Sequence, residues 1–241
     1  MTAPLLFSIV DGVGEIVLNR PDAGNAFDEP MLDAWVAALQ QCHDDDAVRA
    51  VLLRANGRHF CAGGDLHDMK RELEGPPSIH KTKLWSGVHR IPKLMMQIDK
   101  PVVAAMQGAA TGAGLDMALQ CDFRVAADNA RVAASYVKIG LVPGDGGAWL
   151  LPRIVGLPRA LEMLLTGDFV EAEEGRRIGL FNRVVPLAEL ENEARALARR
   201  LADGAATAMR LTKRAAIACR NRMAGQTQIW SAIWRCRFIP E

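Results

Sequence analysis

The sequence predicts an α/β fold, with a core over residues 1–190 and a helical C-terminal region over residues 191–241. Half of the 241 residues are hydrophobic, which is enough to build a sizeable core. The middle of the chain alternates short apolar runs with segments of helical periodicity, a pattern typical of α/β domains. From residue 147 onward, helical patterns dominate.

Five short apolar runs bounded by turn residues predict the strands. They cover residues 7–10, 15–18, 50–53, 100–106 and 122–126. A turn at residues 11–14 joins the first two. Pro101 stands at the beginning of the fourth strand, where a missing N–H donor is tolerated. A further strand-like segment, residues 182–186, interrupts the C-terminal helices.

Helices are expected where apolar residues recur every three or four positions. Asp28 is placed to cap a helix whose apolar residues are Leu32, Trp35, Val36 and Leu39. A short helix is expected at residues 66–70, with Asp65 as its cap. A longer helix is expected over about residues 79–98, and another through residues 115–119.

Charge and cysteine usage exclude several classes of protein. Lys and Arg number 29 against 28 Asp and Glu, so the chain lacks the basic excess of a nucleic-acid-binding protein. No apolar run approaches the ~20 residues of a membrane span, and no secretory pattern opens the sequence. The five cysteines are scattered and the five histidines form no H-x-x-x-H pair. We therefore expect no metal site, no disulfide framework and a cytoplasmic location.

Two glycine-rich segments each connect a predicted strand to a predicted helix, at residues 60–66 and 108–116. Glycine lets the backbone approach a ligand closely, and the first turn of a helix has N–H groups with no partner in the helix. Two such turns facing one point can form an oxyanion hole. Tight packing of helix on strand also requires glycine, so either turn alone fits both interpretations.

The second glycine-rich segment also permits a dinucleotide-binding interpretation. Gly108, Gly112 and Gly114 follow a strand, and Tyr136 and Lys138 lie further along the chain. However, such a loop should follow the first strand of the domain, and no acidic residue stands ~20 positions later to hold a ribose. Tyr136 and Lys138 are also two positions apart rather than one helical turn.

Four segments carry a family resemblance. They are Phe60-Cys-Ala-Gly-Gly-Asp-Leu-His-Asp-Met69, Lys100-Pro-Val-Val-Ala-Ala-Met-Gln-Gly108, Gly112-Ala-Gly-Leu-Asp-Met-Ala-Leu-Gln-Cys-Asp122 and Ile139-Gly-Leu-Val-Pro-Gly-Asp-Gly-Gly147. In order and spacing, over about residues 5–215, the chain resembles the crotonase superfamily, which includes the enoyl-CoA hydratases and isomerases.

The resemblance implies a crotonase-like spiral of ββα repeats that acts on acyl-CoA thioesters, with no cofactor beyond the CoA moiety of the substrate. It also implies a homo-oligomer, a trimer or a dimer of trimers. In the family, two backbone N–H groups stabilise the negative charge that develops on the thioester oxygen. By position these belong to Gly64 and Ala113. The residues expected along the CoA path are Ala23, Ala26, Ala62, Gly64, Asp65, Leu66 and His67.

The acid and base groups follow from the same resemblance. A typical hydratase of this family uses two glutamates, which map onto Asp116 and Tyr136 here. The dienoyl-CoA isomerase branch also carries Asp at the first position, so Asp116 is the expected base. Tyr136 fits either a buried core aromatic or a site residue. Asp145, in the turn before a helix, fits either a helix cap or a catalytic group.

The expected activity is hydration of 2-enoyl-CoA thioesters, with Asp116 as the general base and acid. The first alternative is a double-bond isomerase, which needs only one carboxylate. The second is a catalytically weak acyl-CoA-binding homologue. Residues 216–241 depart from the family's usual ending, so we expect this tail to dock in a non-standard way or to be partly disordered.

Overall fold

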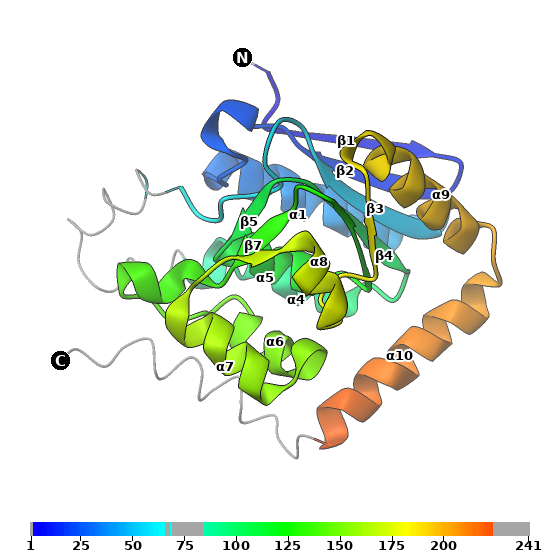
Figure 1. The fold of residues 1–241 in the computed structure, drawn as a ribbon. Coiled ribbons are helices and arrows are strands. Elements are labelled where there is room, and N and C mark those ends of the chain that lie inside the picture. Colours follow the sequence, from blue (N-terminus) through cyan, green and yellow to red (C-terminus); the bar gives the residue numbers. More distant parts are fainter. Residues whose placement is uncertain (1, 66–67, 69–83, 224–241) are drawn as a thin grey trace.

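The computed structural model describes residues 2–65, 68 and 84–223 (Figure 1). The strands are β1 (Leu5–Val10), β2 (Val13–Leu18), β3 (Ala50–Ala55), β4 (Val102–Met106), β5 (Ala109–Thr111), β6 (Phe123–Ala127), β7 (Arg131–Ala133), β8 (Val170–Glu171) and β9 (Arg183–Val185). The α-helices are α1 (Glu29–Asp44), α4 (Arg90–Gln97), α5 (Ala113–Leu119), α6 (Gly147–Val155), α7 (Leu157–Thr166), α8 (Ala172–Arg177), α9 (Leu190–Ala202) and α10 (Ala206–Met223). Short 3₁₀ helices are η1 (Pro21–Ala23), η2 (Ser135–Ile139) and η3 (Leu187–Glu189).

The strands form two sheets in the described part of the chain. The larger sheet has the order β1-β2-β3-β4-β6-β9; β1 is antiparallel to β2, and every other pair is parallel. The smaller sheet has the order β5-β7-β8. Its central strand β7 is parallel to β5 and antiparallel to β8. The small sheet matters for the site because β5 leads directly into α5.

Both faces of the larger sheet are buried. On β3, Val51 and Leu53 belong to one apolar cluster, and Ala50 and Leu52 belong to the other. This alternation follows from the two-residue period of a strand. Helix α9 covers one face, and α1, α4 and α5 cover the other. Strands covered on both faces read as continuous apolar runs, which is how the sequence predicted them.

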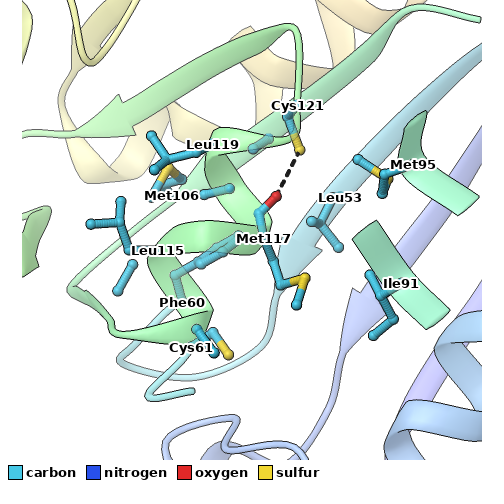
Figure 2. Close-up of a cluster of buried hydrophobic side chains, with 14 of the residues drawn as sticks. Leu53, Phe60, Cys61, Ile91, Met95, Met106, Leu115, Met117, Leu119 and Cys121 are labelled. Atoms are coloured by element: carbon cyan, nitrogen blue, oxygen red, sulfur yellow. Dashed lines mark hydrogen bonds between the residues drawn. The ribbon is translucent and has the colours of Figure 1, made fainter. Parts of the chain in front are cut away.

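Helix α5 lies in the middle of the larger apolar cluster. Leu115, Met117 and Leu119 are each at most 3% exposed and pack among side chains of β3, β4 and α4 (Figure 2). The thiol of Cys121 lies 3.7 Å from the main-chain oxygen of Met117. This packing holds α5, and therefore Asp116 on it, in one orientation.

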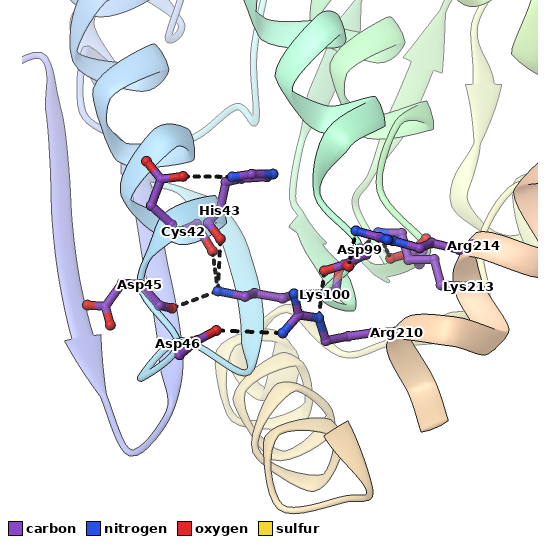
Figure 3. A network of polar contacts seen from close by, with 11 residues as sticks. Cys42, His43, Asp45, Asp46, Asp99, Lys100, Arg210, Lys213 and Arg214 are labelled. Atoms are coloured by element: carbon purple, nitrogen blue, oxygen red, sulfur yellow. Dashed lines mark hydrogen bonds and ion pairs between the residues drawn. The ribbon is translucent and has the colours of Figure 1, made fainter. Parts of the chain in front are cut away.

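The C-terminal end of α1 is held by a buried lysine. Lys100 is only 2% exposed. Its Nζ donates to the main-chain oxygens of Cys42 (2.8 Å), His43 (3.3 Å) and Asp45 (2.6 Å) (Figure 3). The last carbonyls of a helix have no intrahelical donor, so Lys100 satisfies groups that burial would otherwise leave unpaired. Burial lowers the pKa of Lys100.

Helix α10 is attached to the same region by charged side chains (Figure 3). Arg210 Nε lies 2.8 Å from Asp99 Oδ1, and Arg214 contacts the other oxygen of Asp99 at 2.6 Å. Lys213 Nζ donates to Asp122 Oδ2 at 2.7 Å. These contacts come from the first part of the helix. Residues 224–241, on which the predicted atypical tail mostly falls, lie outside the described residues.

The strand predictions are confirmed with small changes at their ends, and Asp28 does cap α1, its Oδ1 accepting from the Met31 N–H at 3.0 Å. Strands β5, β7 and β8 were not predicted, because strands of two or three residues are too short to show an alternation of apolar and polar side chains. The continuous helix expected over residues 79–98 is wrong within the described part. A turn at residues 87–89, which contains Gly87, separates residues 84–86 from α4.

Candidate active site

The two glycine-rich segments lie side by side. The N–H of Thr111 donates to the oxygen of Cys61 at 3.0 Å, and Cys61 and Ala110 form a parallel bridge. The N–H groups of Phe60 and Cys61 both reach the oxygen of Ala109. These bonds attach the first segment to β5, immediately before α5 begins. The two glycine-rich segments therefore meet at one place, as the sequence predicted.

Glycine is required in both turns by close backbone approach. Gly63 has φ +94°, and a Cβ on it would lie 3.0 Å from the Thr111 oxygen and 3.4 Å from the Ala113 nitrogen. A Cβ on Gly114 would lie 2.3 Å from the Cys61 oxygen, closer than any real contact. The packing interpretation of these glycines is thus confirmed. The same approach brings the first turn up to the N–H end of α5.

The loop at residues 20–28 forms the other side of the first turn. The Phe27 N–H donates to the Gly63 oxygen at 2.9 Å, and the Asp65 N–H donates to the Phe27 oxygen at 3.2 Å. Successive N–H groups of an extended segment point to opposite sides. The N–H of Gly64 therefore points away from Phe27.

A single arginine links this loop to the first turn. Arg20 contacts the carboxylate of Asp65 at 3.2 Å and that of Asp28 at 3.2 Å, and it also donates to the Ala26 oxygen. The N–H of Ala62 donates to the Gly24 oxygen at 3.0 Å. The residues expected along the CoA path at positions 23, 26, 62, 64 and 65 thus lie where the 20–28 loop contacts the first glycine-rich turn. Leu66, His67 and the helix expected at residues 66–70 lie outside the described residues, apart from residue 68.

Four polar side chains from separate parts of the chain meet behind the turns. The hydroxyl of Tyr136 (η2) lies 2.9 Å from Asp116 Oδ2 (α5) and 3.0 Å from Asp145 Oδ2, which precedes α6. The other oxygen of Asp145 lies 3.0 Å from Nε2 of His89, which precedes α4. All four residues are at most 6% exposed. Buried polar groups of this kind are held in place by one another.

Asp116 is fixed from a second direction by the beginning of α6. Its Oδ2 accepts the N–H of Gly147 at 2.9 Å, and a Cβ on Gly147 would lie 2.2 Å from Asp116 Oδ1. Gly146 is the N-cap of α6 and has no side chain to cap it. The helix-cap role considered for Asp145 is therefore wrong: a carboxylate from another helix, Asp116, takes the N–H, while Asp145 faces Tyr136 and His89.

The environment of Tyr136 keeps its hydroxyl protonated. Burial raises the pKa of Tyr136 well above its usual value, and the charges of Asp116 and Asp145 raise it further. Tyr136 thus combines the two roles considered for it: it is a buried aromatic, and its hydroxyl contacts the expected base. As a neutral phenol it is a hydrogen-bond donor and not a base.

The dinucleotide-binding interpretation is wrong. The glycine-rich segment follows β4, in the middle of the sheet, and Lys138 pairs with Asp168 at the surface instead of approaching Tyr136. Among the described residues, no group of three or more His, Cys, Asp or Glu side chains is arranged to hold a metal ion. No described helix is both long and apolar enough to cross a membrane.

Sequence reasoning missed His89. His89 was considered only as a possible metal ligand, and it belongs to no motif. Its position next to Asp145 depends on how α4 packs against α1 and on the turn before α6, and both are set by tertiary structure. One usable signal was present: Asp145 is an acid among glycine and apolar residues, and an acid that becomes buried there requires a polar or charged partner.

Comparisons with known proteins agree on one family. The model of the enoyl-CoA hydratase/isomerase family matches residues 8–232. The chain is 35% identical to the 1,2-epoxyphenylacetyl-CoA isomerase of Escherichia coli over 88% of this chain and 80% of that protein. It is also 35% identical to the short-chain-enoyl-CoA hydratase of Clostridium acetobutylicum, over 84% and 77% of the two chains. The solved structure of an enoyl-CoA hydratase from Mycobacterium avium subsp. paratuberculosis aligns with a TM-score of 0.85 at 31% identity, covering 98% of this chain and 91% of that one.

Proposed function

Because the chain belongs to the enoyl-CoA hydratase/isomerase family and has its crotonase fold, we propose that it adds water to 2-enoyl-CoA thioesters. The observation that carries this proposal is the position of Asp116. Its carboxylate is buried, is fixed by the Gly147 N–H and the Tyr136 hydroxyl, and lies on the helix that begins where the two glycine-rich turns meet.

Two main-chain N–H groups would hold the thioester oxygen. Ala113 is the first residue of α5, so its N–H has no acceptor within the helix. The N–H of Gly64 points away from Phe27, and Gly63 brings this turn to within contact of Ala113. Both donors belong to the backbone, so they are rigid and need no reorganisation when negative charge develops on the oxygen.

Asp116 would carry the proton in both directions. As a carboxylate it accepts a proton from water while the water oxygen bonds to Cβ of the enoyl group and the electron pair moves to the thioester oxygen. As a carboxylic acid it then returns that proton to Cα, which restores the carbonyl. A family hydratase uses a second carboxylate where this chain has Tyr136. Here Asp145, 3.0 Å from the Tyr136 hydroxyl, supplies a second acidic group.

Double-bond isomerisation is the second candidate. It needs one carboxylate to move a proton between Cα and Cγ, and Asp116 is the carboxylate mounted on α5 itself. Tyr136 occupies the position of the second family acid without being able to act as a base at neutral pH. The similarity to an isomerase at 35% identity supports the same candidate.

One pair of substrates separates the candidates. Hydration of crotonyl-CoA removes the absorbance of the conjugated enoyl thioester, whereas isomerisation of a 3-enoyl-CoA creates it. Asp116→Asn should abolish either reaction while CoA-thioester binding persists, because the side chain keeps its shape and loses its basicity. Full turnover by Asp116→Asn would refute the assignment. Binding of CoA thioesters with neither reaction would identify a catalytically weak homologue.

Assembly and location are part of the same proposal. A trimer or a dimer of trimers follows from family membership, and sedimentation or light scattering of the purified protein tests it. The thiols of Cys42, Cys61 and Cys121 are free and buried, which supports a reducing compartment such as the cytoplasm. No cofactor beyond the CoA moiety of the substrate enters the proposed chemistry.

A further inference from the structure

Strand β5 is hydrogen-bonded along both of its edges. Alternate N–H groups of a strand point to opposite sides, so β5 pairs with β7 on one side and with the first glycine-rich segment on the other. On this second side the Thr111 N–H donates to the main-chain oxygen of Cys61 at 3.0 Å. The Ala109 N–H, two residues earlier on the same edge, donates instead to a side chain, at 3.1 Å to Nδ1 of His59. An imidazole thus takes the place of a main-chain acceptor in this pairing.

The structure makes room for this imidazole and fixes the backbone that carries it. A Cβ on Gly108, whose φ is +55°, would lie 2.8 Å from His59 Nδ1 and closer still to the main-chain oxygen of Arg58. Only glycine therefore fits beside the ring. The main-chain oxygen of His59 accepts from Nδ2 of the fully buried Asn25 at 2.8 Å. The position of the ring is thus set from two sides.

The hydrogen bond to Ala109 requires a neutral imidazole. A neutral histidine has one ring nitrogen that accepts a hydrogen bond, whereas a protonated one has two N–H donors. A proton on Nδ1 would place two donors against each other and remove the acceptor of the Ala109 N–H. Burial lowers the pKa of His59, and so do the charges of Arg58, its neighbour in the chain, and Arg131, which lies opposite Ala109 in β7. Both of these charges are positive and oppose protonation of the ring.

The contact lies close to both proposed donors of the oxyanion hole. Ala109 is four residues before Ala113, and His59 is five residues before Gly64. Because the first glycine-rich turn approaches the first residue of α5, a change in how this segment contacts β5 changes the spacing of the two N–H groups. A site built from fixed donors works only when its geometry is held to within about 0.5 Å.

We propose that neutral His59 is a positioning residue for the oxyanion hole. Its Nδ1 accepts the Ala109 N–H, which completes the hydrogen bonding of the first glycine-rich segment to β5. This contact fixes how far the Gly64 N–H lies from the Ala113 N–H. The ring proton is then on Nε2, and a second proton, on Nδ1, breaks the contact. The inference rests on the proposed function where it concerns the oxyanion hole, whereas the hydrogen bond can be measured without substrate.

Nitrogen NMR of the imidazole tests the hydrogen bond directly. The ¹⁵N signals of a histidine ring distinguish a protonated from an unprotonated nitrogen, and His59→Asn identifies the signals of His59. At about pH 8, above the usual histidine pKa of about 6.5, we expect an unprotonated Nδ1. The Ala109 amide should exchange slowly with solvent in the wild type and faster in His59→Leu. A proton on Nδ1 at this pH, or equal exchange of the Ala109 amide in the two proteins, would overturn the proposal.

Two variants of similar shape separate the acceptor from the bulk of the ring. His59→Asn keeps an acceptor that does not titrate, because Asn Oδ1 occupies the branch position of Nδ1, and His59→Leu has no acceptor. At about pH 8 the kcat of His59→Asn should stay within about twofold of wild type, and that of His59→Leu should fall about tenfold with little change in KM, the effect of one lost hydrogen bond. His43→Leu, at a side chain 38% exposed on α1, should change neither constant. Equal kcat values for His59→Asn and His59→Leu would refute the positioning role.

The pH dependence of activity provides a readout that a purely structural role does not move. The ratio of kcat/KM in wild type to that in His59→Asn cancels the titration of groups common to both proteins. It should be constant above the pKa of His59 and fall below it, with the midpoint at which the His59 nitrogen signals titrate. Because this pKa is lowered, the midpoint lies below about pH 6.5.

The ratio must follow the state of the ring at every pH. If the ring stays neutral down to the lowest pH at which the protein remains folded, the ratio should stay constant throughout. A ratio that falls while the ring is neutral, or that stays constant while the ring becomes protonated, would overturn the proposal.

The two proposals fail in distinguishable ways. If no enoyl-CoA is converted although Nδ1 is unprotonated and the Ala109 amide is protected, the proposed function is wrong and His59 only holds β5 in place. If enoyl-CoA is converted but His59→Leu has the kcat of wild type, the proposed function stands and the positioning role is wrong.

Discussion

Adding one methyl group at Gly147 should disable the site through Asp116. A Cβ at this position would lie 2.2 Å from Asp116 Oδ1 and 2.8 Å from its carboxyl carbon. A comfortable carbon–oxygen contact is about 3.3 Å. The carboxylate must therefore move by about 1 Å, or α6 must move by the same amount. Gly147 is in an ordinary helical conformation, so the backbone itself tolerates alanine.

The expected loss of activity follows from that displacement. A 1 Å misplacement of a catalytic group costs about a hundredfold in rate, which is about 2.7 kcal/mol of transition-state stabilisation. Gly147→Ala should therefore lower kcat about a hundredfold for whichever enoyl-CoA the enzyme converts. KM should change little, because the junction between the 20–28 loop and the first glycine-rich turn is untouched. Steady-state kinetics that follow the enoyl absorbance measure both constants.

A double-mutant cycle on stability separates this clash from a general packing defect. Overpacking in a buried site costs about 1–3 kcal/mol of unfolding free energy. In an Asp116→Ala background the atoms that the new methyl group meets are gone, so Gly147→Ala should cost nothing there. Alanine favours helix over glycine by up to about 1 kcal/mol, so in that background the substitution should be neutral or stabilising. A cost in the Asp116→Ala background as large as in wild type, measured by urea unfolding, would refute the reasoning.

Three further predictions follow from other parts of the structure. Lys100→Met removes the Nζ donor from the main-chain oxygens of Cys42, His43 and Asp45 and should lower the unfolding free energy by about 2–4 kcal/mol. Lys138→Met at the surface should change it by less than about 0.5 kcal/mol, and urea unfolding compares the two variants. Because the pKa of Tyr136 is raised, the folded state keeps its phenol proton where the unfolded chain loses it, so this contribution to stability is complete below about pH 10 and is lost as pH rises above it. Above about pH 10 the unfolding free energy of the wild type should therefore fall more steeply with pH than that of Tyr136→Phe, and an identical pH dependence would contradict the shift. Burial raises the pKa of the thiols of Cys42, Cys61 and Cys121 to about 12, so mass spectrometry after alkylation should find these three modified only when the protein is denatured.

The sequence predicted most of the large sheet because its strands are covered on both faces. Such strands are continuous apolar runs, and residues 50–53 and 102–106 could be recognised without knowing their neighbours. The small sheet was missed because β8 has two residues and β5 and β7 have three, too few to show a period. The break before α4 was missed because the helical pattern on both sides of Gly87 remained in phase with one continuous helix.

The site was predictable where it depends on backbone and hidden where it depends on distant side chains. The glycines at 63 and 114 are visible in the sequence because their conformation or close packing excludes other residues. The partners of Asp145 are not visible in this way. His89 is 56 positions earlier and Asp116 is on another helix, so only the packed fold shows that Asp145 faces a histidine and a phenol.

Tyr136 and Asp145 are best considered together, because both lie next to Asp116 in the buried site. Tyrosine at position 136 alone would leave Asp116 as the one carboxyl group of the site, held by a neutral phenol. An aspartate at position 145 alone would be a buried acid in need of a donor. Together they place a second carboxyl group one hydroxyl away from the first, 2.9 Å and 3.0 Å on the two sides of Oη. The Tyr136 hydroxyl connects Asp145 to Asp116, so in the proposed reaction we expect Asp145 to act through Tyr136. Replacing Tyr136 by Phe should then uncouple the two aspartates. The effect of Asp145→Asn on kcat, whatever its size in the wild type, should disappear in a Tyr136→Phe background, and an undiminished effect there would show that Asp145 reaches the substrate directly.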